Sequence, residues 1–519
     1  MSRASTVLAV LLLCGAAPAQ ALHKDAVRGF QFKPPKDYQA IALDPLEKVL
    51  IAKYQDPTKS WGGANGTASF NSLYTIRFYP TKPATKAATA DGEETSDPAL
   101  KHLESAFGFY TVDKENKLSL AGSAGRELQL TPSANGDVKV YAALLPQEDG
   151  IFLFEGVAVA TRFSKEVQEF ARATKSFKRT SKADTSEHDA ELAQMDEQER
   201  FLQQQIDKLP PGWSHLRTKR YLFLFDADKA FVKQMGDQVE AMRDAYEKLY
   251  PPDPKKPITA VSIVRVCASF DEFAGYSGAG PGVGGYWNDT ARELVFYDKA
   301  PRTETLCVLN HEAFHQYIYY FYGELAPHSW YNEGHGDYFS GARLTKTYRI
   351  TEYANAPGGF DRTQLIKDMV RLAREGKSPE EGAAAPLKEL LHFSQPEYYS
   401  QSPLRPVAYY PEGWAVVHYL RETRNLPPKQ AKLLPDYLQN LLTARAEVAE
   451  ELMKKRLADA EKVKEGSSDD MPKDPKAYYG DVDQKKVQDR AYDKTFKDWT
   501  EADWAAFQEA VWDHVEKRL

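Results

Sequence analysis

Apolar and polar residues alternate in several short runs within the first 180 residues. The clearest runs are residues 73–78, 126–130, 138–145 and 151–160, and turn-forming residues such as Asn135-Gly136-Asp137 separate them. A period of two is typical of β-strands, and tight turns between consecutive strands favour an antiparallel sheet. Helical spacing occurs at 98–107 and 164–174. We therefore expect an antiparallel α/β sandwich over residues 22–180.

The pattern changes after this region. Residues 181–211 are polar with spaced apolar positions, which predicts a helical linker ending at Pro210-Pro211. An apolar run at 221–225, helical spacing at 229–250 and a second strand at 258–266 then predict a mixed sheet with a helix packed on it. A hairpin follows at 286–288 and 293–297. Its second strand is expected either to hold an extended substrate or to be only a structural edge strand.

Helical patterns dominate the remainder of the chain. Residues 443–465 are rich in Ala, Glu, Lys and Leu, and residues 500–515 repeat aromatic and aliphatic positions at helical spacing. We divide the chain into a domain at 212–445 and a charged helical C-terminal extension at 446–519. The predicted fold class is α+β.

The first 21 residues have the pattern of a signal peptide. Arg3 precedes an apolar run at 7–13, and Ala19-Gln20-Ala21 forms a small-x-small cleavage site. Attachment of a lipid through Cys14 is less favoured, because the bulky Leu13 stands where a small residue is required. No other stretch has 18 uninterrupted apolar residues, so no integral membrane segment is expected after cleavage. The expected location is periplasmic or extracellular.

The net charge and the cysteine content limit the functions that this chain can have. The net charge of −7 has mixed signs, which argues against nucleic-acid binding. Cys267 and Cys307 would remain after cleavage at residue 21, and they could form a disulfide or stay as two buried thiols. The sequence does not determine the oligomeric state.

The strongest chemical signal is His311-Glu312-Ala313-Phe314-His315, within a segment that reads as a helix. Residues four apart share a helix face, so His311 and His315 can place two imidazole nitrogens on one Zn²⁺. Glu312 lies beside them and can act as a general base toward the attacking water.

A second segment strengthens this interpretation. Glu333 follows His315 by 18 positions, which allows one helix to end and another to begin, and its carboxylate can be the third ligand. Asp337, one turn later, can accept a hydrogen bond from a ligand histidine. Three protein ligands leave one coordination position open, which is the catalytic arrangement. We expect one Zn²⁺ per chain.

These motifs resemble the gluzincin metallopeptidases, the superfamily of thermolysin and aminopeptidase N, and especially uncharacterised secreted bacterial proteins of that type. The similarity rests on His-Glu-x-x-His followed by Trp-x-Asn-Glu-Gly-x-x-x-Tyr-Phe, and it covers roughly residues 215–445. It implies a zincin-type domain in which His311, His315 and Glu333 bind zinc and Glu312 is catalytic.

Other features bear on this resemblance. The spacing to Glu333 is one residue shorter than in aminopeptidase N, and the Gly-x-Met-x-Asn segment that binds a free amino terminus is missing. Thermolysin-like chemistry needs an oxyanion donor. Tyr409 and Tyr410 are the candidates by position, with core packing as the alternative. The N-terminal pattern is similar to PsbP-like α/β sandwich domains.

The resulting expectation is an exported zinc metallopeptidase, an endopeptidase acting on peptides or proteins. Two alternatives stay open. One is a non-catalytic envelope scaffold that keeps a zincin fold, and the other is a zinc hydrolase of a different amide, such as cell-wall material.

Overall fold

The computed structural model describes residues 22–58, 61–62, 69–80, 97–255, 257–323, 325–354, 361–401, 408–463 and 471–519. The expected signal peptide at 1–21 lies outside the described residues. Two compact units are present: residues 1–211 with 274–281, and residues 212–273 with 282–519. Helices and antiparallel strands occur in both, which confirms the α+β class.

The first unit is built on a seven-stranded antiparallel sheet. Its order is β3 (Gln39–Ala40), β4 (Leu50–Gln55), β7 (Leu73–Pro80), β11 (Gly150–Val159), β10 (Val138–Gln147), β9 (Ser123–Pro132) and β8 (Tyr110–Leu120). Small sheets are formed by β1 (His23–Asp25), β2 (Phe30–Phe32) and β12 (Lys178–Arg179), and by β5 (Trp61–Gly62) with β6 (Ser69–Phe70). Successive strands β8 to β11 pair with their chain neighbours, as the tight turns predict.

Two apolar cores hold two of the helices of this unit. One contains Phe163 and Phe170 of helix α2 (Ala160–Lys175), and the other contains Ala99 and Leu103 of helix α1 (Pro98–Phe107). Because side chains alternate across a strand, residues of β10 contribute to both cores. The sheet is therefore covered on both faces, which is the expected sandwich.

The sequence pattern misjudged some elements of this unit. Strand β8 was not predicted, because it is an edge strand whose side chains are mostly exposed and polar. Helix α2 begins at Ala160, four residues before the expected start. The linker holds two helices, α3 (Ser186–Gln194) and α4 (Glu197–Asp207), because Asp196 caps the second helix through the backbone N–H of Glu199.

A five-stranded mixed sheet organises the second unit. Its order is β13 (Ser214–Arg217), β14 (Tyr221–Phe225), β15 (Ser262–Cys267), β17 (Glu293–Tyr297) and β16 (Gly285–Asn288). Strand β17 pairs in parallel with β15 and antiparallel with β16. The expectation that 293–297 is the exposed edge strand is therefore wrong. Among the described residues, β16 occupies that edge, because the hairpin folds back beyond β17.

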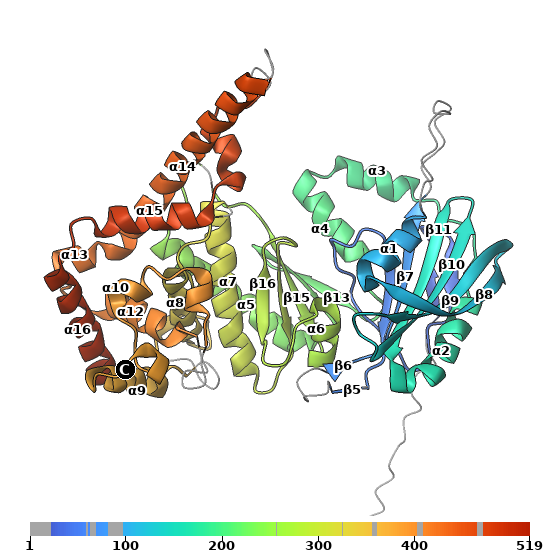
Figure 1. Cartoon of the computed structure of the whole chain (residues 1–519), viewed down its shortest axis with the longest axis horizontal. Helices are drawn as coiled ribbons and strands as arrows, with labels where there is room; N and C mark the ends of the chain where they lie inside the picture. Colours follow the sequence, from blue (N-terminus) through green and yellow to red (C-terminus); the bar gives the residue numbers. More distant parts are fainter. Residues whose placement is uncertain are drawn as a thin grey trace, which may run out of the picture. The chain divides into compact units, whose positions relative to one another are not determined.

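Helices α5 (Lys229–Leu249) and α7 (Arg302–Tyr322) lie beside each other next to this sheet, as Figure 1 shows. Helix α8 (Ser329–Ser340) packs against α7 and against α12 (Tyr410–Glu422). The remaining elements up to residue 431 are α6 (Phe270–Ser277), β18 (Ala342–Leu344), β19 (Ile350–Tyr353), α9 (Thr363–Arg374), η2 (Pro379–Glu381), α10 (Leu387–Leu390), α11 (Gln395–Tyr398) and α13 (Pro428–Ala431).

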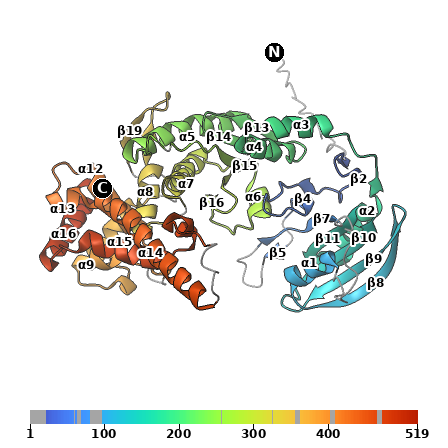
Figure 2. The same cartoon turned by 90° about the horizontal axis from the view of Figure 1, so that it is seen from above.

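The C-terminal segment belongs to the same core. Helix α14 (Leu433–Val463) runs through the predicted boundary at 445/446, and α15 (Gln484–Phe496) packs along it, as Figures 1 and 2 show. Between them lies η3 (Pro475–Asp481), and α16 (Glu501–Arg518) follows. Buried Phe507, Val511 and Val515 of α16 join the cluster formed by α7, α8 and α12. The C-terminal helices thus pack into the second unit, because the apolar stripe of α16 is buried there.

Two further expectations concern cysteines and membranes. Cys267 and Cys307 are both buried and have free thiols. The structure therefore has two separate buried thiols and not the disulfide that the sequence also allowed. Within the described part of the chain, no helix combines the length and the apolar character needed to cross a bilayer.

A pair of acidic side chains in the second unit predicts a pH-dependent stability. Asp226, after β14, and buried Glu272 of α6 both accept a hydrogen bond from the backbone N–H of Ala268, at 2.8 and 3.0 Å. Burial and the Asp226 carboxylate raise the pKa of Glu272 from 4.5 to about 8. Folding therefore favours protonated Glu272, and this stabilisation is complete below about pH 4.5 and is lost as the pH rises through about 8.

We expect Glu272→Gln to raise the melting temperature at pH 8.5 and to change it little at pH 5, because the amide is neutral throughout. Thermal unfolding at both pH values measures this. The matched control is Asp498→Asn, whose side chain is 79% exposed. Equal effects of Glu272→Gln at both pH values would contradict the assignment.

Candidate metal centre and active site

Helix α7 carries the two histidines on one face. It ends at Gly323, whose φ of 64° allows the left-handed turn that closes the helix. The rings of His311 and His315 are one turn apart with centroids 4.6 Å from each other. The ligand atoms of His311, Glu312 and His315 all lie within 4.8 Å of one another. The helix alone therefore presents a compact set of metal-binding groups.

Helix α8 brings a carboxylate to the same point. Oε2 of Glu333 lies 3.1 Å from Nε2 of His311 and 3.5 Å from Nε2 of His315. All three side chains are largely buried. Glu333, the predicted third ligand, therefore lies close to Nε2 of both imidazoles.

The opposite nitrogen of each imidazole is held by its own partner. Nδ1 of His311 lies 3.2 Å from Oδ1 of Asp337, the position predicted for an orienting carboxylate. Nδ1 of His315 lies 3.0 Å from Oδ1 of Asn332. An acceptor at Nδ1 fixes the Nδ1–H tautomer and leaves Nε2 with a free lone pair for a metal.

Close approach of α8 to α7 depends on a glycine. A Cβ on Gly336 would lie 2.6 Å from Cε1 and Nε2 of His311. Gly334 makes a different contact, because its Cβ would lie 2.4 Å from the carbonyl oxygen of Gly413 on α12. Only Gly336 faces the first helix, and it gives the His311 ring its space.

The charges at this site suit a divalent cation. With neutral imidazoles, the carboxylates of Glu312, Glu333 and Asp337 outnumber the single guanidinium of Arg362, which donates to Asp337 at 2.9 Å. Burial lowers the pKa of His311, but hydrogen bonds to Asp337 and Glu333 outweigh it and raise the pKa to about 10.

The pKa values of His315 and Glu333 are also shifted, in opposite directions. Burial lowers the pKa of His315, but the Glu333 charge reverses this and raises it. Burial raises the pKa of Glu333, but His315 and His311 hold it well below its ordinary value. The pocket thus draws positive charge toward Nε2 of both imidazoles. Two imidazoles and one carboxylate form a donor set that Zn²⁺ accepts, so these residues fit the ion.

Glu312 stands beside these candidate metal ligands and lines two cavities. Its Oε2 accepts a hydrogen bond from the backbone N–H of Trp287 on β16, at 3.0 Å. Burial raises its pKa, partly offset by the charges of His311 and His315. Glu312 lines one cavity of about 340 Å³ and another of about 710 Å³. A raised pKa and an anchored carboxylate are properties of a general base.

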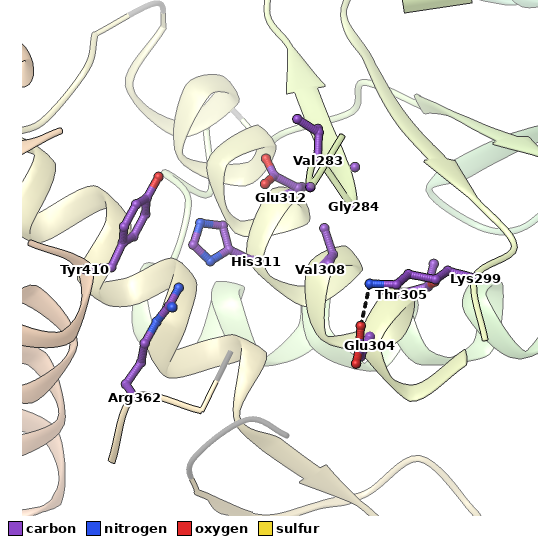
Figure 3. A pocket seen from close by; sticks show the side chains of 12 residues that line it. Val283, Gly284, Lys299, Glu304, Thr305, Val308, His311, Glu312, Arg362 and Tyr410 are labelled. Carbon is purple, nitrogen blue, oxygen red and sulfur yellow. Dashed lines mark hydrogen bonds and ion pairs between the residues drawn. The ribbon is translucent and has the colours of Figure 1, made fainter. Parts of the chain in front are cut away.

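The two tyrosine candidates have different positions. Tyr410 lines the smaller cavity together with His311, Glu312 and Arg362, as Figure 3 shows. Tyr409 is buried beside Phe393, with ring centroids 4.9 Å apart, and is not among the described residues that line this cavity. For Tyr409 the structure therefore has the alternative that the sequence left open, which is core packing.

The sequence pattern did not identify three residues that contact the candidate ligands or Asp337. Tyr399 donates from its hydroxyl to Oε1 of Glu333 at 2.7 Å, Arg362 holds Asp337, and Asn332 holds His315. Asn332 lies next to Glu333 and could have been found from the Trp-x-Asn-Glu-Gly segment. Arg362 and Tyr399 lie 25 and 66 positions from their partners, and no local spacing signals them.

Tyr399 and Tyr410 both remain hydrogen-bond donors. Burial and the Glu333 charge raise the pKa of each phenol well above its ordinary value. The hydroxyls therefore stay protonated. Tyr410 can donate to negative charge that develops nearby, whereas the one proton of the Tyr399 hydroxyl is held by Oε1 of Glu333.

Comparison with known proteins gives little guidance. No family model and no curated protein matches the chain. Among solved structures, cyanobacterial PsbP from Synechocystis sp. PCC 6803 matches 32% of this chain and 97% of its own, with 14% identity and a TM-score of 0.24. The Ran-binding protein Mog1p from Saccharomyces cerevisiae matches 31% and 95%, with 12% identity and a TM-score of 0.20. A Pseudomonas aeruginosa protein of unknown function, PA94, matches 30% and 93%, with 9% identity and a TM-score of 0.18. These TM-scores are too low to support any inference about the function of this chain.

Proposed function

We propose that this chain is a zinc-dependent endopeptidase of the gluzincin type, with His311, His315 and Glu333 as metal ligands. One observation carries the proposal: two Nε2 atoms from α7 and one carboxylate from α8 converge within 3.1–3.5 Å, with Glu312 beside them. When bound, the ion would supply Lewis acidity that polarises the scissile carbonyl and acidifies water.

The chain's own residues supply the remaining chemistry. Glu312 takes a proton from the attacking water and delivers it to the leaving amine. Asp337 and Asn332 keep the imidazoles oriented. Tyr410 is the donor available to the oxyanion, and Tyr399 holds Glu333 through its hydroxyl.

Substrate would bind along the edge of the sheet. The Trp287 N–H points toward Glu312 and thus away from β17, so the outer edge of β16, which pairs with no further strand among the described residues, faces the active-site helix. An extended peptide can pair with such an edge. Cavities on both sides of Glu312 give room for the chain in both directions, which favours internal cleavage over removal of terminal residues.

The test is metal content combined with cleavage. We expect one zinc per chain by atomic absorption, loss of casein cleavage after treatment with 1,10-phenanthroline, and recovery when zinc is added back. His311→Ala should lower both the zinc content and the cleavage. One bound zinc without cleavage of any peptide or protein would favour the scaffold alternative, and cleavage of cell-wall fragments alone would favour the other hydrolase.

A further inference from the structure

Both cavities beside Glu312 mix polar and apolar side chains, but each contains its own recognition group. The larger one is walled by Trp287 and Tyr319, whose rings meet edge to face with centroids 5.6 Å apart. Ile318 and Leu325 also line it, together with polar side chains such as Asp289 and Arg292. An aromatic side chain entering here would add a further edge-to-face contact, so this cavity favours aromatic groups.

The smaller cavity has a polar floor. It lies between residues 282–285 and the first turns of α7, and its far side carries Lys299, Glu304 and Thr305, as Figure 3 shows. Nζ of Lys299 donates to Oε2 of Glu304 at 2.6 Å. Val283 and Val308 also line this cavity, and a Cβ on Gly284 would lie 3.1 Å from Cγ2 of Val308.

This ion pair discriminates between entering side chains. An aliphatic side chain would remove water from both charges without replacing its hydrogen bonds. A charged side chain would attract one member of the pair and repel the other. A long neutral amide can accept from Lys299 and donate to Glu304, so glutamine fits best.

The direction of the edge strand assigns the two cavities to the two sides of the scissile bond. Strand β16 runs from Gly285, beside the smaller cavity, to Asn288, near the larger one. A peptide paired antiparallel to β16 places its amino-terminal part at the Trp287 end.

We propose that the cleft selects an aromatic residue on the amino-terminal side of the scissile bond and glutamine on its carboxyl-terminal side. This rests on the proposed function. In the reaction the C–N bond breaks, the oxygen of water joins the carbonyl carbon as part of the new carboxylate, and its protons go to solvent and to the new amine.

The test uses three otherwise identical peptides with Phe-Gln, Phe-Leu or Gln-Phe at the centre. Rates give kcat/KM, and mass spectrometry identifies the cleaved bond. We expect Phe-Gln to exceed both others by at least about tenfold, the discrimination typical of one well-fitted side chain. Lys299→Met combined with Glu304→Met should reverse the order of Phe-Gln and Phe-Leu, because the floor becomes apolar.

The matched control is Glu450→Met with Lys454→Met, which removes a surface ion pair of the same 2.6 Å length on α14 and should leave the order unchanged. Faster cleavage of Gln-Phe would overturn the assigned direction, and equal rates for all three peptides would overturn the selectivity while leaving the peptidase assignment intact. Zinc-loaded protein that cuts no peptide at all would overturn the proposed function, and this inference with it.

Discussion

Glu312→Gln is expected to reduce kcat for peptide cleavage by roughly 10²–10⁴-fold, the contribution typical of a general base. Glutamine has the same shape, and its amide oxygen can still accept from the backbone N–H of Trp287, which donates to Glu312 at 3.0 Å. It cannot take a proton from water. Zinc content and KM should therefore change little, while kcat falls.

The control for this substitution is Glu509→Gln, which removes a carboxylate in a surface ion pair with Arg374 and should leave kcat unchanged. Atomic absorption on the purified variants separates loss of the base from loss of the metal. Undiminished cleavage by Glu312→Gln would show that another group accepts the proton and would remove the basis for the mechanism.

Gly336→Ala is expected to weaken zinc binding by about 10–100-fold, the range typical when the support of a ligand is disturbed. The new Cβ would lie 2.6 Å from the His311 ring, which must then move away from Glu333 and Asp337. Alanine is a better helix former than glycine by about 1 kcal/mol, so the backbone of α8 offers no reason for a loss. Competition with a fluorescent zinc chelator measures the affinity.

Gly280→Ala provides the comparison, because a Cβ there meets no atom within 4 Å. It should bind zinc as the parent does. Parent-like affinity in Gly336→Ala would mean that His311 is not held against α8 in the metal-bound state, and the ligand set would have to be revised.

Local patterns were sufficient for several regular elements that are largely buried. The alternating runs of the first unit became β7, β9, β10 and β11, and helical spacing at 229–250 became α5. The strand β8 escaped notice because an exposed edge strand has no buried face to impose alternation. The order of β16 and β17 in the sheet was also not predicted. The sequence of a hairpin does not indicate which of its two strands pairs with the rest of the sheet.

The sequence by itself determined the pair His311 and His315 with Glu312 between them, because the period of the helix fixes which residues share a face. It also indicated Glu333 and Asp337 through the spacing within one turn of α8. Only the tertiary structure decided that Tyr399 and Arg362 reach these carboxylates and that Tyr409 turns into the core. Such contacts depend on how α8, α9, α11 and α12 pack against one another, and packing joins residues whose separation along the chain has no fixed period.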